Sequence, residues 1–367
     1  MTVHELKKTV ENSGIVGAGG GGFPTHMKLD IRAKTVVLNC AECEPLVNVD
    51  QYLLANYTQE IISALSIISQ ALDCDIVIAI KKHYVTAVSA VNKHIEQEPR
   101  MGLKLLEATY PAGDEILLLY EALGIIIPPG AFPIESGCIV LNVETVYNIH
   151  NAIANGAAVT HKWLTIAGEV EKPVVSRVPV GTSVPDAVKE AGSITTDDPV
   201  FIVGGAMMGD ATSQVITKTT NAILVLPRDH YLVRRAQSSP SVQLNRVASA
   251  CCQCRSCTDM CPRYLLGYPI EPHKIMRAAS ARDPASQAFM GAMYCGLCGL
   301  CEMVACPQSL APRSIIKILR TALVKAGVKA KKHEAKPVSQ DLQYRKTAAS
   351  RLKTRLGLAQ YDIGVDV

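Results

Sequence analysis

Two blocks of closely spaced cysteines are the residues in this chain best suited to chemistry. The first reads Cys251-x-x-Cys254-x-x-Cys257-x-x-x-Cys261-Pro, and the second reads Cys295-x-x-Cys298-x-x-Cys301-x-x-x-x-Cys306-Pro. Three thiolates spaced three residues apart can surround one face of an iron–sulfur cubane, while a more distant Cys before Pro turns away to ligate another cluster. The spacing therefore predicts two [4Fe-4S] clusters.

The expected ligands exchange one cysteine between the two blocks. One predicted cluster takes Cys251, Cys254, Cys257 and Cys306, and the other takes Cys295, Cys298, Cys301 and Cys261. A pair of structural zinc sites is the alternative, because C-x-x-C pairs also hold zinc. The third Cys in register and the Cys-Pro endings favour clusters. Such a module carries single electrons, so the rest of the chain must meet an electron donor or acceptor.

A run of glycines near the N-terminus and an acidic loop after it form the second candidate site. Residues 17–22 contain G-x-G-x-x-G, but a helix-like segment precedes them and Pro24 follows, so they match the dinucleotide-binding fingerprint poorly. A glycine loop still lets a flat ring or a phosphate approach the backbone closely. Asn39, Glu42 and Glu44 follow a short β-branched run, at the strand end where open α/β sheets bind ligands.

The elements that must position these residues alternate along the first half of the chain. Helices are predicted at 1–12, 50–72, 83–97, 113–123 and 144–154, with strands at 36–38, 75–80 and 138–141. This order favours an α/β layer sandwich with a largely parallel sheet. Strands at 163–167, 174–180, 199–203 and 222–226 with a helix at 184–191 predict a small β-rich module. Helix-forming sequence flanks the Cys blocks. We expect domains at 1–158, 159–235 and 236–325, and a basic tail at 326–367.

Composition and charge limit the class of protein. The 367 residues are 48% hydrophobic, which indicates a folded protein, and 5% aromatic, too few for a stacking platform for nucleic acid. From residue 311 onward there are thirteen Lys or Arg against four Asp or Glu. This basic segment is expected to form solvated helices or to be partly disordered, with docking on an acidic partner or a membrane as the alternative. No apolar run is long enough to span a bilayer and no signal sequence is seen, which predicts a cytoplasmic protein with reduced thiols.

The order of the motifs resembles a known family of flavoproteins. The glycine run with Phe23-Pro-Thr, then Asn39 to Pro45, Tyr110 to Glu115, and Asn142 to Thr145, is similar to the flavin-binding subunit of respiratory complex I and to the C subunit of Rnf ion-pumping complexes. This likeness covers about residues 14–155. The Cys region and the segment after Tyr344 resemble more closely the cobalamin reductases of propanediol-utilisation microcompartments, over nearly the whole chain.

The resemblance implies an architecture and a set of site residues. The architecture is a flavin-binding α/β sandwich, a β-grasp ligand-binding-like module, and a helical two-cluster ferredoxin-like domain. Glu44 and Glu115 would be catalytic beside the nicotinamide, although Ala41 and Asp114 stand where the family usually has Glu or another acid. The implied cofactor-binding residues are Gly17, Gly19, Gly20, Gly22, Phe23, Lys28, Asn39, Glu42, Tyr110, Gly113, Asn142 and Thr145.

The same resemblance implies an electron path. NADH would reduce FMN, the two clusters would carry single electrons, and cobalamin would accept them, which would reactivate a cobalamin-dependent diol dehydratase. An adenosyltransferase, the dehydratase or shell proteins of a bacterial microcompartment would be partners. The alternative is an NADH-oxidising peripheral subunit of a membrane ion pump. The β-grasp module is expected to be a structural bridge, because it lacks a cluster of titratable groups.

Overall fold

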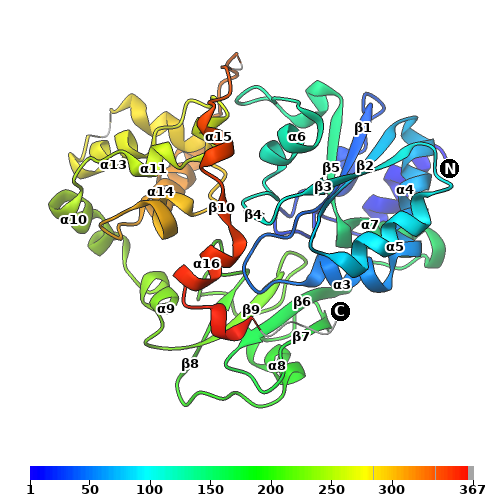
Figure 1. Cartoon of the computed structure of the whole chain (residues 1–367), viewed down its shortest axis with the longest axis horizontal. Coiled ribbons are helices and arrows are strands. Elements are labelled where there is room, and N and C mark those ends of the chain that lie inside the picture. Colours follow the sequence, from blue (N-terminus) through cyan, green and yellow to red (C-terminus); the bar gives the residue numbers. More distant parts are fainter. Residues whose placement is uncertain (284, 335, 363–367) are drawn as a thin grey trace.

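The computed structural model describes residues 1–283, 285–334 and 336–362, and three packed units can be followed along the chain (Figure 1). The predicted basic tail includes residues 335 and 363–367, which lie outside the described residues.

The first unit is built on a parallel four-stranded sheet with the order β3-β2-β1-β5. The strands are β1 (Thr35–Cys40), β2 (Asp75–Lys81), β3 (Met101–Leu106) and β5 (Cys138–Asn142). Val36 and Leu38 pack into one core while Val37 packs into another, because successive side chains of a strand point to opposite faces. The predicted parallel sheet is confirmed, and β3 is a strand that the sequence patterns did not predict.

Helices cover both faces of this sheet unequally. One core joins the sheet to α1 (Val3–Asn12), α3 (Val49–Asn56), α4 (Thr58–Leu72), α5 (Val85–Ile95) and α7 (Val143–Asn155). The opposite core joins it to α6 (Glu115–Leu123) and to residues of the Cys-bearing unit. The prediction of one helix over 50–72 is wrong. Tyr57 leaves the helical conformation, at φ −132°, and its ring packs on Tyr147 at 5.0 Å between centroids.

The second unit is a four-stranded sheet with the order β7-β6-β9-β8. Its elements are β6 (His161–Gly168), β7 (Val174–Pro179), α8 (Val184–Val188), β8 (Pro199–Val203) and β9 (Ala222–Pro227). Apolar residues of α8 and of all four strands share one core. The predicted small β-rich module with one helix is therefore present. Its 217–221 turn lies beside the glycine loop: a Cβ at Gly22 would be 3.2 Å from Thr219 Cγ2, and Lys218 Nζ donates to the carbonyl of Gly14, just before the loop, at 2.6 Å.

The third unit carries the eight clustered cysteines among short helices. They are α9 (Tyr231–Ala236), α10 (Pro240–Ala250), α11 (Ser256–Asp259), α12 (Pro262–Leu265), α13 (Pro272–Ser280) and α14 (Pro312–Lys325). A π-helical turn spans Cys301–Ala305. In Figure 1 this unit lies beside α6 and above β8, so it contacts both of the other units.

Residues 336–362, here called the C-terminal strap, cross all three units (Figure 1). They include α15 (Asp341–Tyr344), β10 (Thr347–Ala348) and α16 (Ala349–Arg355), and β10 pairs with β4 (Thr109–Tyr110) of the first unit. Leu352 of α16 and Leu356, the residue that caps this helix, join a core that contains residues of the β-rich module and of the π-helical turn. Tyr361 donates to Glu169 Oε1 at 2.7 Å. The described part of the basic segment is therefore packed on the protein.

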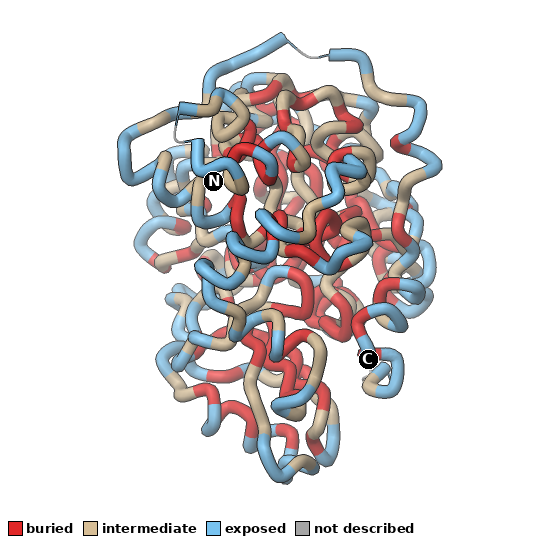
Figure 2. The backbone as a smooth tube through the Cα atoms, turned by 90° about the vertical axis from the view of Figure 1, so that its left-hand side faces the viewer, coloured by how far each residue is buried: buried red, intermediate tan, exposed pale blue. Residues whose placement is uncertain are grey.

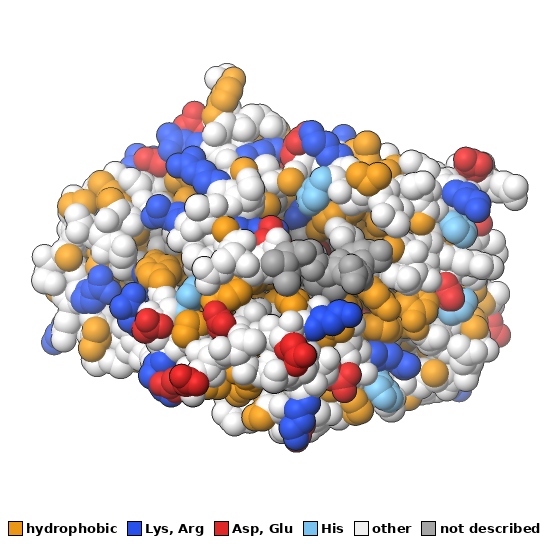
Figure 3. Space-filling model, turned by 60° about the horizontal axis from the view of Figure 1, so that its bottom comes forward, with side chains coloured by type: hydrophobic (Ala, Val, Ile, Leu, Met, Phe, Trp, Pro, Cys, Tyr) orange, Lys and Arg blue, Asp and Glu red, His pale blue; other side chains and the backbone are white. Residues whose placement is uncertain are grey.

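Buried stretches of the chain gather in the interior of the molecule, and exposed stretches form its outline (Figure 2). On the face shown in Figure 3, basic and acidic side chains are interspersed and form no continuous basic surface. Within the described residues, no helix is both long and apolar enough to cross a membrane.

Candidate flavin and iron–sulfur sites

The glycine loop is a closed turn beside the first sheet. Gly22 N donates to the Gly17 carbonyl at 3.0 Å, and Gly17 N donates to the Phe23 carbonyl at 2.9 Å. Ala18 N donates to Thr145 Oγ1 at 3.0 Å, which fixes the loop to the first turn of α7. The loop therefore stands over the carboxyl ends of the parallel strands, where α/β sheets bind ligands.

The crest of this loop fits an anionic, flat cofactor such as FMN. Gly19, Gly20 and Gly21 are exposed, and among the described residues their N–H groups have no acceptor. A Cβ at Gly21 would meet no protein atom within 4 Å, whereas one at Gly19 would lie 3.2 Å from the Asn142 side chain. Successive free amides in a glycine turn form a concave donor site for phosphate, and the open space beyond Gly21 leaves room for it.

Asn142 and Thr145 are placed by the start of α7. Asn142 is the N-cap, its Oδ1 accepting from Glu144 N at 3.1 Å, and its Nδ2 donates to both carboxylate oxygens of Asp50 at 2.9 Å. The cap satisfies an otherwise free helix amide. The Asn142 amide and the Thr145 hydroxyl therefore have fixed orientations beside the glycine loop.

Asp50 and Lys81 belong to this site and were not predicted from the sequence. Asp50 N donates to Glu42 Oε2 at 3.2 Å, and Lys81 Nζ donates to the Glu42 carbonyl at 2.5 Å. Burial raises the pKa of Asp50 to about 7, and burial followed by the Asp50 charge raises the pKa of Glu42 well above its usual range. Burial lowers the pKa of Lys81. A lysine directly after the apolar run 76–80 was the available signal for Lys81.

Lys28 and Glu115 form an ion pair beside β5, an outer strand of the same sheet. Lys28 Nζ lies 2.9 Å from Glu115 Oε1 and donates to the Val140 carbonyl of β5 at 3.0 Å. Both side chains are partly exposed, and Phe23 is exposed as well. These groups remain accessible to a bound nucleotide.

Asn39, Gly113 and Glu44 lie where the first unit meets its neighbours. Asn39 Nδ2 donates to the Gly113 carbonyl at 3.0 Å, and a Cβ at Gly113 would lie 2.7 Å from the Ala41 carbonyl oxygen, so glycine is needed there. Glu44 Oε2 accepts from Met207 N of the β-rich module at 2.8 Å, while its buried Oε1 has no partner among the described residues. Burial raises the pKa of Glu44 to about 7.

Four of the clustered thiols line one cavity. Cys261, Cys295, Cys298 and Cys301 surround it together with Pro111, Asp114 and Arg313. Burial, and next the charge of Cys295, raises the pKa of Cys261 to about 12. This set contains the last Cys of the first block and the first three of the second, the grouping expected from the sequence, and four thiols around one space are the donor set of a [4Fe-4S] cluster.

The other four thiols stand together nearer the surface. Burial raises the pKa of Cys257 to about 12, with further contributions from the charges of Cys306, Cys254 and Cys251. Cys254 is exposed, whereas Cys301 of the other group is buried. Among the described residues no three His, Cys, Asp or Glu side chains converge on a single-ion site, and a cubane does not need them to because it spreads its ligands over four irons.

The two Cys blocks repeat the same backbone turns. Gln253 and Leu297 each stand two residues after the first Cys of their block and have φ of 57° and 56°. Arg255 and Gly299 stand four residues after it, at 67° and 82°. These left-handed residues turn the loop so that Leu297 N donates to Cys295 Sγ at 3.3 Å. Amide hydrogen bonds to sulfur help set the potential of a bound cluster.

Side chains tie the thiol-lined cavity to the first unit. Tyr110 Oη donates to the Cys298 carbonyl at 2.5 Å. Arg263 Nη2 lies 2.9 Å from Asp114 Oδ2, and both side chains are largely buried. Asp114 is also the N-cap of α6, accepting from Ile116 N and Leu117 N at 3.1 Å. The predicted Tyr110 to Glu115 motif therefore forms the contact between the sheet with the glycine loop and the cavity with four thiols.

Comparisons with known proteins agree with this geometry. Residues 10–151 match the Nuo51 FMN-binding domain, 164–211 match the SLBB domain, and 250–311 match a 4Fe-4S dicluster domain. Cobalamin reductase PduS of Citrobacter freundii is 37% identical over 97% of this chain and 79% of its own length. The chain belongs to the PduS cobalamin reductase family. The predicted fold class, with its flavin-binding, β-grasp and dicluster parts, is confirmed.

More distant relatives share parts of this PduS-type chain. The C subunit of the ion-translocating oxidoreductase complex of Edwardsiella ictaluri is 30% identical over 72% of the chain but only 33% of its own length. A crystal structure of an NAD⁺-reducing [NiFe]-hydrogenase aligns with a TM-score of 0.58 at 19% identity, covering 95% of this chain and 66% of that chain. That likeness shows a shared fold.

Proposed function

We propose that this protein is an NADH-dependent cobalamin reductase that passes electrons through FMN and two [4Fe-4S] clusters. The observation that supports it most is the shared wall of Pro111 and Asp114, through which the cavity with four thiols adjoins the unit that carries the glycine loop. An electron carrier placed against a flavin site is useful only if electrons pass between them. Membership of the PduS family favours a corrinoid as the acceptor.

The residues of the chain have separable tasks in this proposal. Bound FMN would supply the conversion between a two-electron donor and one-electron carriers. The amides of Gly19, Gly20 and Gly21 would bind its phosphate, and Asn142 and Thr145 would orient it. NADH gives up two electrons and leaves as NAD⁺ and a proton, while cob(III)alamin takes one electron to become cob(II)alamin and a second to become cob(I)alamin.

The thiols also suggest an order for the two clusters. Cys261, Cys295, Cys298 and Cys301 adjoin the flavin unit, so their cluster would receive electrons first. Cys251, Cys254, Cys257 and Cys306 would hold the second, nearer the surface. We further propose that the product serves a cobalamin-dependent diol dehydratase, with an adenosyltransferase or shell proteins of a bacterial microcompartment as partners.

The test is an anaerobic assay of the reconstituted protein. Protein loaded with iron, sulfide and FMN is mixed with NADH and aquacobalamin, and the corrinoid spectrum is followed while cob(I)alamin is trapped by alkylation. We expect rapid reduction that free FMN does not reproduce. Bleaching of flavin and clusters by NADH without any corrinoid reduction would contradict the proposal and favour a component of a membrane complex.

The flavin site can be tested separately with Gly21→Ala. Its Cβ would meet no protein atom within 4 Å, so the fold should tolerate the change, and a loss of bound FMN would report the cofactor itself. Gly102→Ala on β3 is the matched control, because it also meets nothing within 4 Å. We expect about tenfold weaker FMN binding for Gly21→Ala alone, the effect of about 1.4 kcal/mol. Equal FMN affinity in both variants would place the flavin elsewhere.

A further inference from the structure

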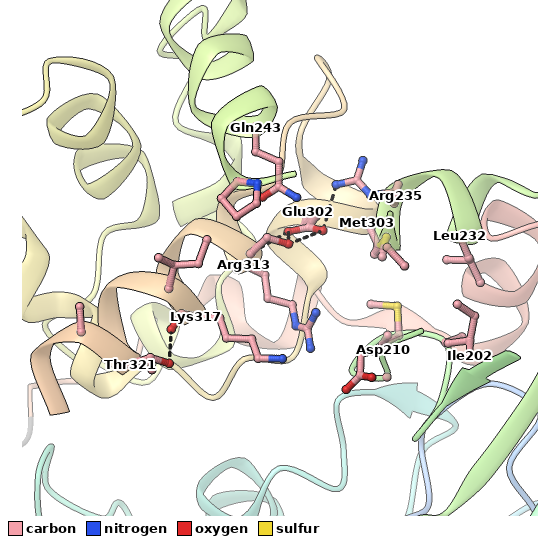
Figure 4. A pocket seen from close by; sticks show the side chains of 18 of the residues that line it. Ile202, Asp210, Leu232, Arg235, Gln243, Glu302, Met303, Arg313, Lys317 and Thr321 are labelled. Atoms are coloured by element: carbon pink, nitrogen blue, oxygen red, sulfur yellow. Dashed lines mark hydrogen bonds and ion pairs between the residues drawn. The ribbon is translucent and has the colours of Figure 1, made fainter. Parts of the chain in front are cut away.

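A large cavity lies where the β-rich module meets the Cys-bearing unit, and the electron path described above does not use it. It encloses about 550 Å³, a volume typical of small-molecule sites. Its walls come from β8 and the turn after it, from α9 and α10, from the π-helical turn, and from α14 (Figure 4). We call it the junction cavity.

The junction cavity adjoins the cavity with four thiols. Arg313 lines both cavities. Gly299, which lines the cavity with four thiols, lies beside this side chain: a Cβ built on Gly299 would be 3.4 Å from Arg313 Cδ. Glu302 and Met303, which line the junction cavity, directly follow Cys301 in the π-helical turn. The same turn ends next to Cys306, so the wall of the junction cavity adjoins ligands of both predicted clusters, and an acceptor there could take electrons after the second.

The polar lining of the junction cavity contains more cations than acids. Arg235, Arg313, Lys317 and Lys325 face the cavity against two acids, Asp210 and Glu302. Glu302 already pairs with Arg235 at 3.1 Å and accepts from Ser314 N at 3.0 Å. Asp210 accepts from Thr212 and Ser213 within its own turn. Among the described residues, Lys317 and Lys325 form no ion pair, so the cavity has a surplus of donors.

Two further lining atoms are buried without a partner among the described residues: Arg235 Nε and Gln243 Oε1. Leaving a buried donor or acceptor unpaired is unfavourable. Both atoms lie behind the surface of the cavity, so a ligand would reach them only if these two side chains turned toward it. Buried side chains of Ile202, Leu232 and Met303 form an apolar wall of the cavity (Figure 4).

We propose that the junction cavity takes the amide-bearing edge of the corrinoid acceptor. Primary amides offer oxygen acceptors to Lys317 and Lys325, while the ring edge suits the apolar wall. A corrinoid exceeds the cavity in size, so the rest of the ring, with its cobalt, would stay at the mouth of the cavity. This inference rests on the proposed cobalamin reductase function and assigns its acceptor site.

The experiment blocks the cavity from an exposed position. Ile318 lines the cavity on α14 and is 45% exposed, whereas Val324 on the same helix is 56% exposed and does not line it. Holoprotein carrying Ile318→Trp or Val324→Trp is titrated with hydroxocobalamin by ultrafiltration without NADH, and KM for the corrinoid is measured separately. Thr321→Trp is a second blocking variant if Ile318→Trp folds poorly.

We expect Ile318→Trp to weaken hydroxocobalamin binding and raise its KM about tenfold, the loss of roughly one hydrogen bond with its packing. Val324→Trp should bind as the unchanged protein does, and NADH oxidation with ferricyanide should be the same in all. Unchanged affinity in both blocking variants would overturn the assigned site while leaving the reductase function intact. Unchanged protein that neither binds nor reduces cobalamin, yet reduces ferricyanide, would overturn both.

Discussion

The buried ion pair between Lys162 and Glu144 should be essential for joining the flavin unit to the β-rich module. The two side chains are 1% and 2% exposed. Glu144 lies between Asn142 and Thr145 in the first turn of α7, and its Oε1 accepts from Trp163 N of β6 at 3.0 Å. Lys162→Met keeps an unbranched side chain, one atom shorter, and removes the charge.

The structure sets the expected size of the effect. Removing one partner leaves an uncompensated charge in the interior, which costs about 3–5 kcal/mol. In the double variant Lys162→Met with Glu144→Gln no charge is left, and the Gln amide still accepts from Trp163 N, so we expect a loss of about 1–2 kcal/mol. The loss in Lys162→Met should shrink as the pH falls, because a protonated Glu144 needs no countercharge.

Anaerobic urea unfolding followed by circular dichroism measures these free energies, and FMN content reports whether the first turn of α7 has moved. Lys189→Met is the matched control, since Lys189 pairs with Asp186 at 2.7 Å but is 77% exposed, and such pairs contribute about 0–1 kcal/mol. The reasoning is refuted if Lys162→Met costs no more than Lys189→Met, or if the double variant loses the sum of both single losses.

Three other predictions follow from the sites. Burial raises the pKa of Glu44 to about 7, so the folded state keeps a proton that the unfolded state loses between about pH 4.5 and 7. The free energy of unfolding of Glu44→Gln, relative to that of the unchanged protein, should therefore increase by up to about 3 kcal/mol as the pH rises from 5 to 8. An unfolding free energy that changes equally in both proteins between these pH values would contradict this. Cys298→Ala should keep NADH oxidation with ferricyanide but slow cobalamin reduction, and equal loss of both activities would argue against a linear path. Asp114→Asn keeps the α6 cap but leaves Arg263 without its charge partner, so the free energy of unfolding should fall by about 1–3 kcal/mol and the urea midpoint should fall with it. An unchanged midpoint would show that the pair contributes nothing.

The sequence allowed good prediction where the signal is local. The spacing of the cysteines is a pattern in the sequence itself. The match to a 4Fe-4S dicluster domain and the equivalent turns at Gln253 and Leu297 agree with the predicted cluster-binding unit. β1, β2 and β5 are apolar runs buried by the layers around them, so their composition indicates strands.

The missed features depend on contacts between distant residues. β3 is an edge strand that contains Gly102 and an exposed Leu105, so neither composition nor alternation revealed it. The pairing of β4 with β10 joins residues more than 230 positions apart. In the sequence, Asp50 is an ordinary acidic residue in the first turn of a helix. Its place in the site depends on its hydrogen bond with Asn142, which lies far away in the chain.

The C-terminal strap has a consequence for how electrons would travel. The strap pairs with the first unit through β10 and enters, through α16, a core that also contains residues of the β-rich module and the Cys-bearing unit. Near the end of its described part, Tyr361 bonds to Glu169 of the β-rich module. If the strap holds the three units together, the flavin and the two clusters keep constant distances from one another. Electrons would then tunnel between them over fixed distances. A swinging carrier is slowed by a viscous solvent because its domains must diffuse. We therefore expect glycerol to leave the internal transfer rate unchanged and to slow only the arrival and departure of NADH and the acceptor.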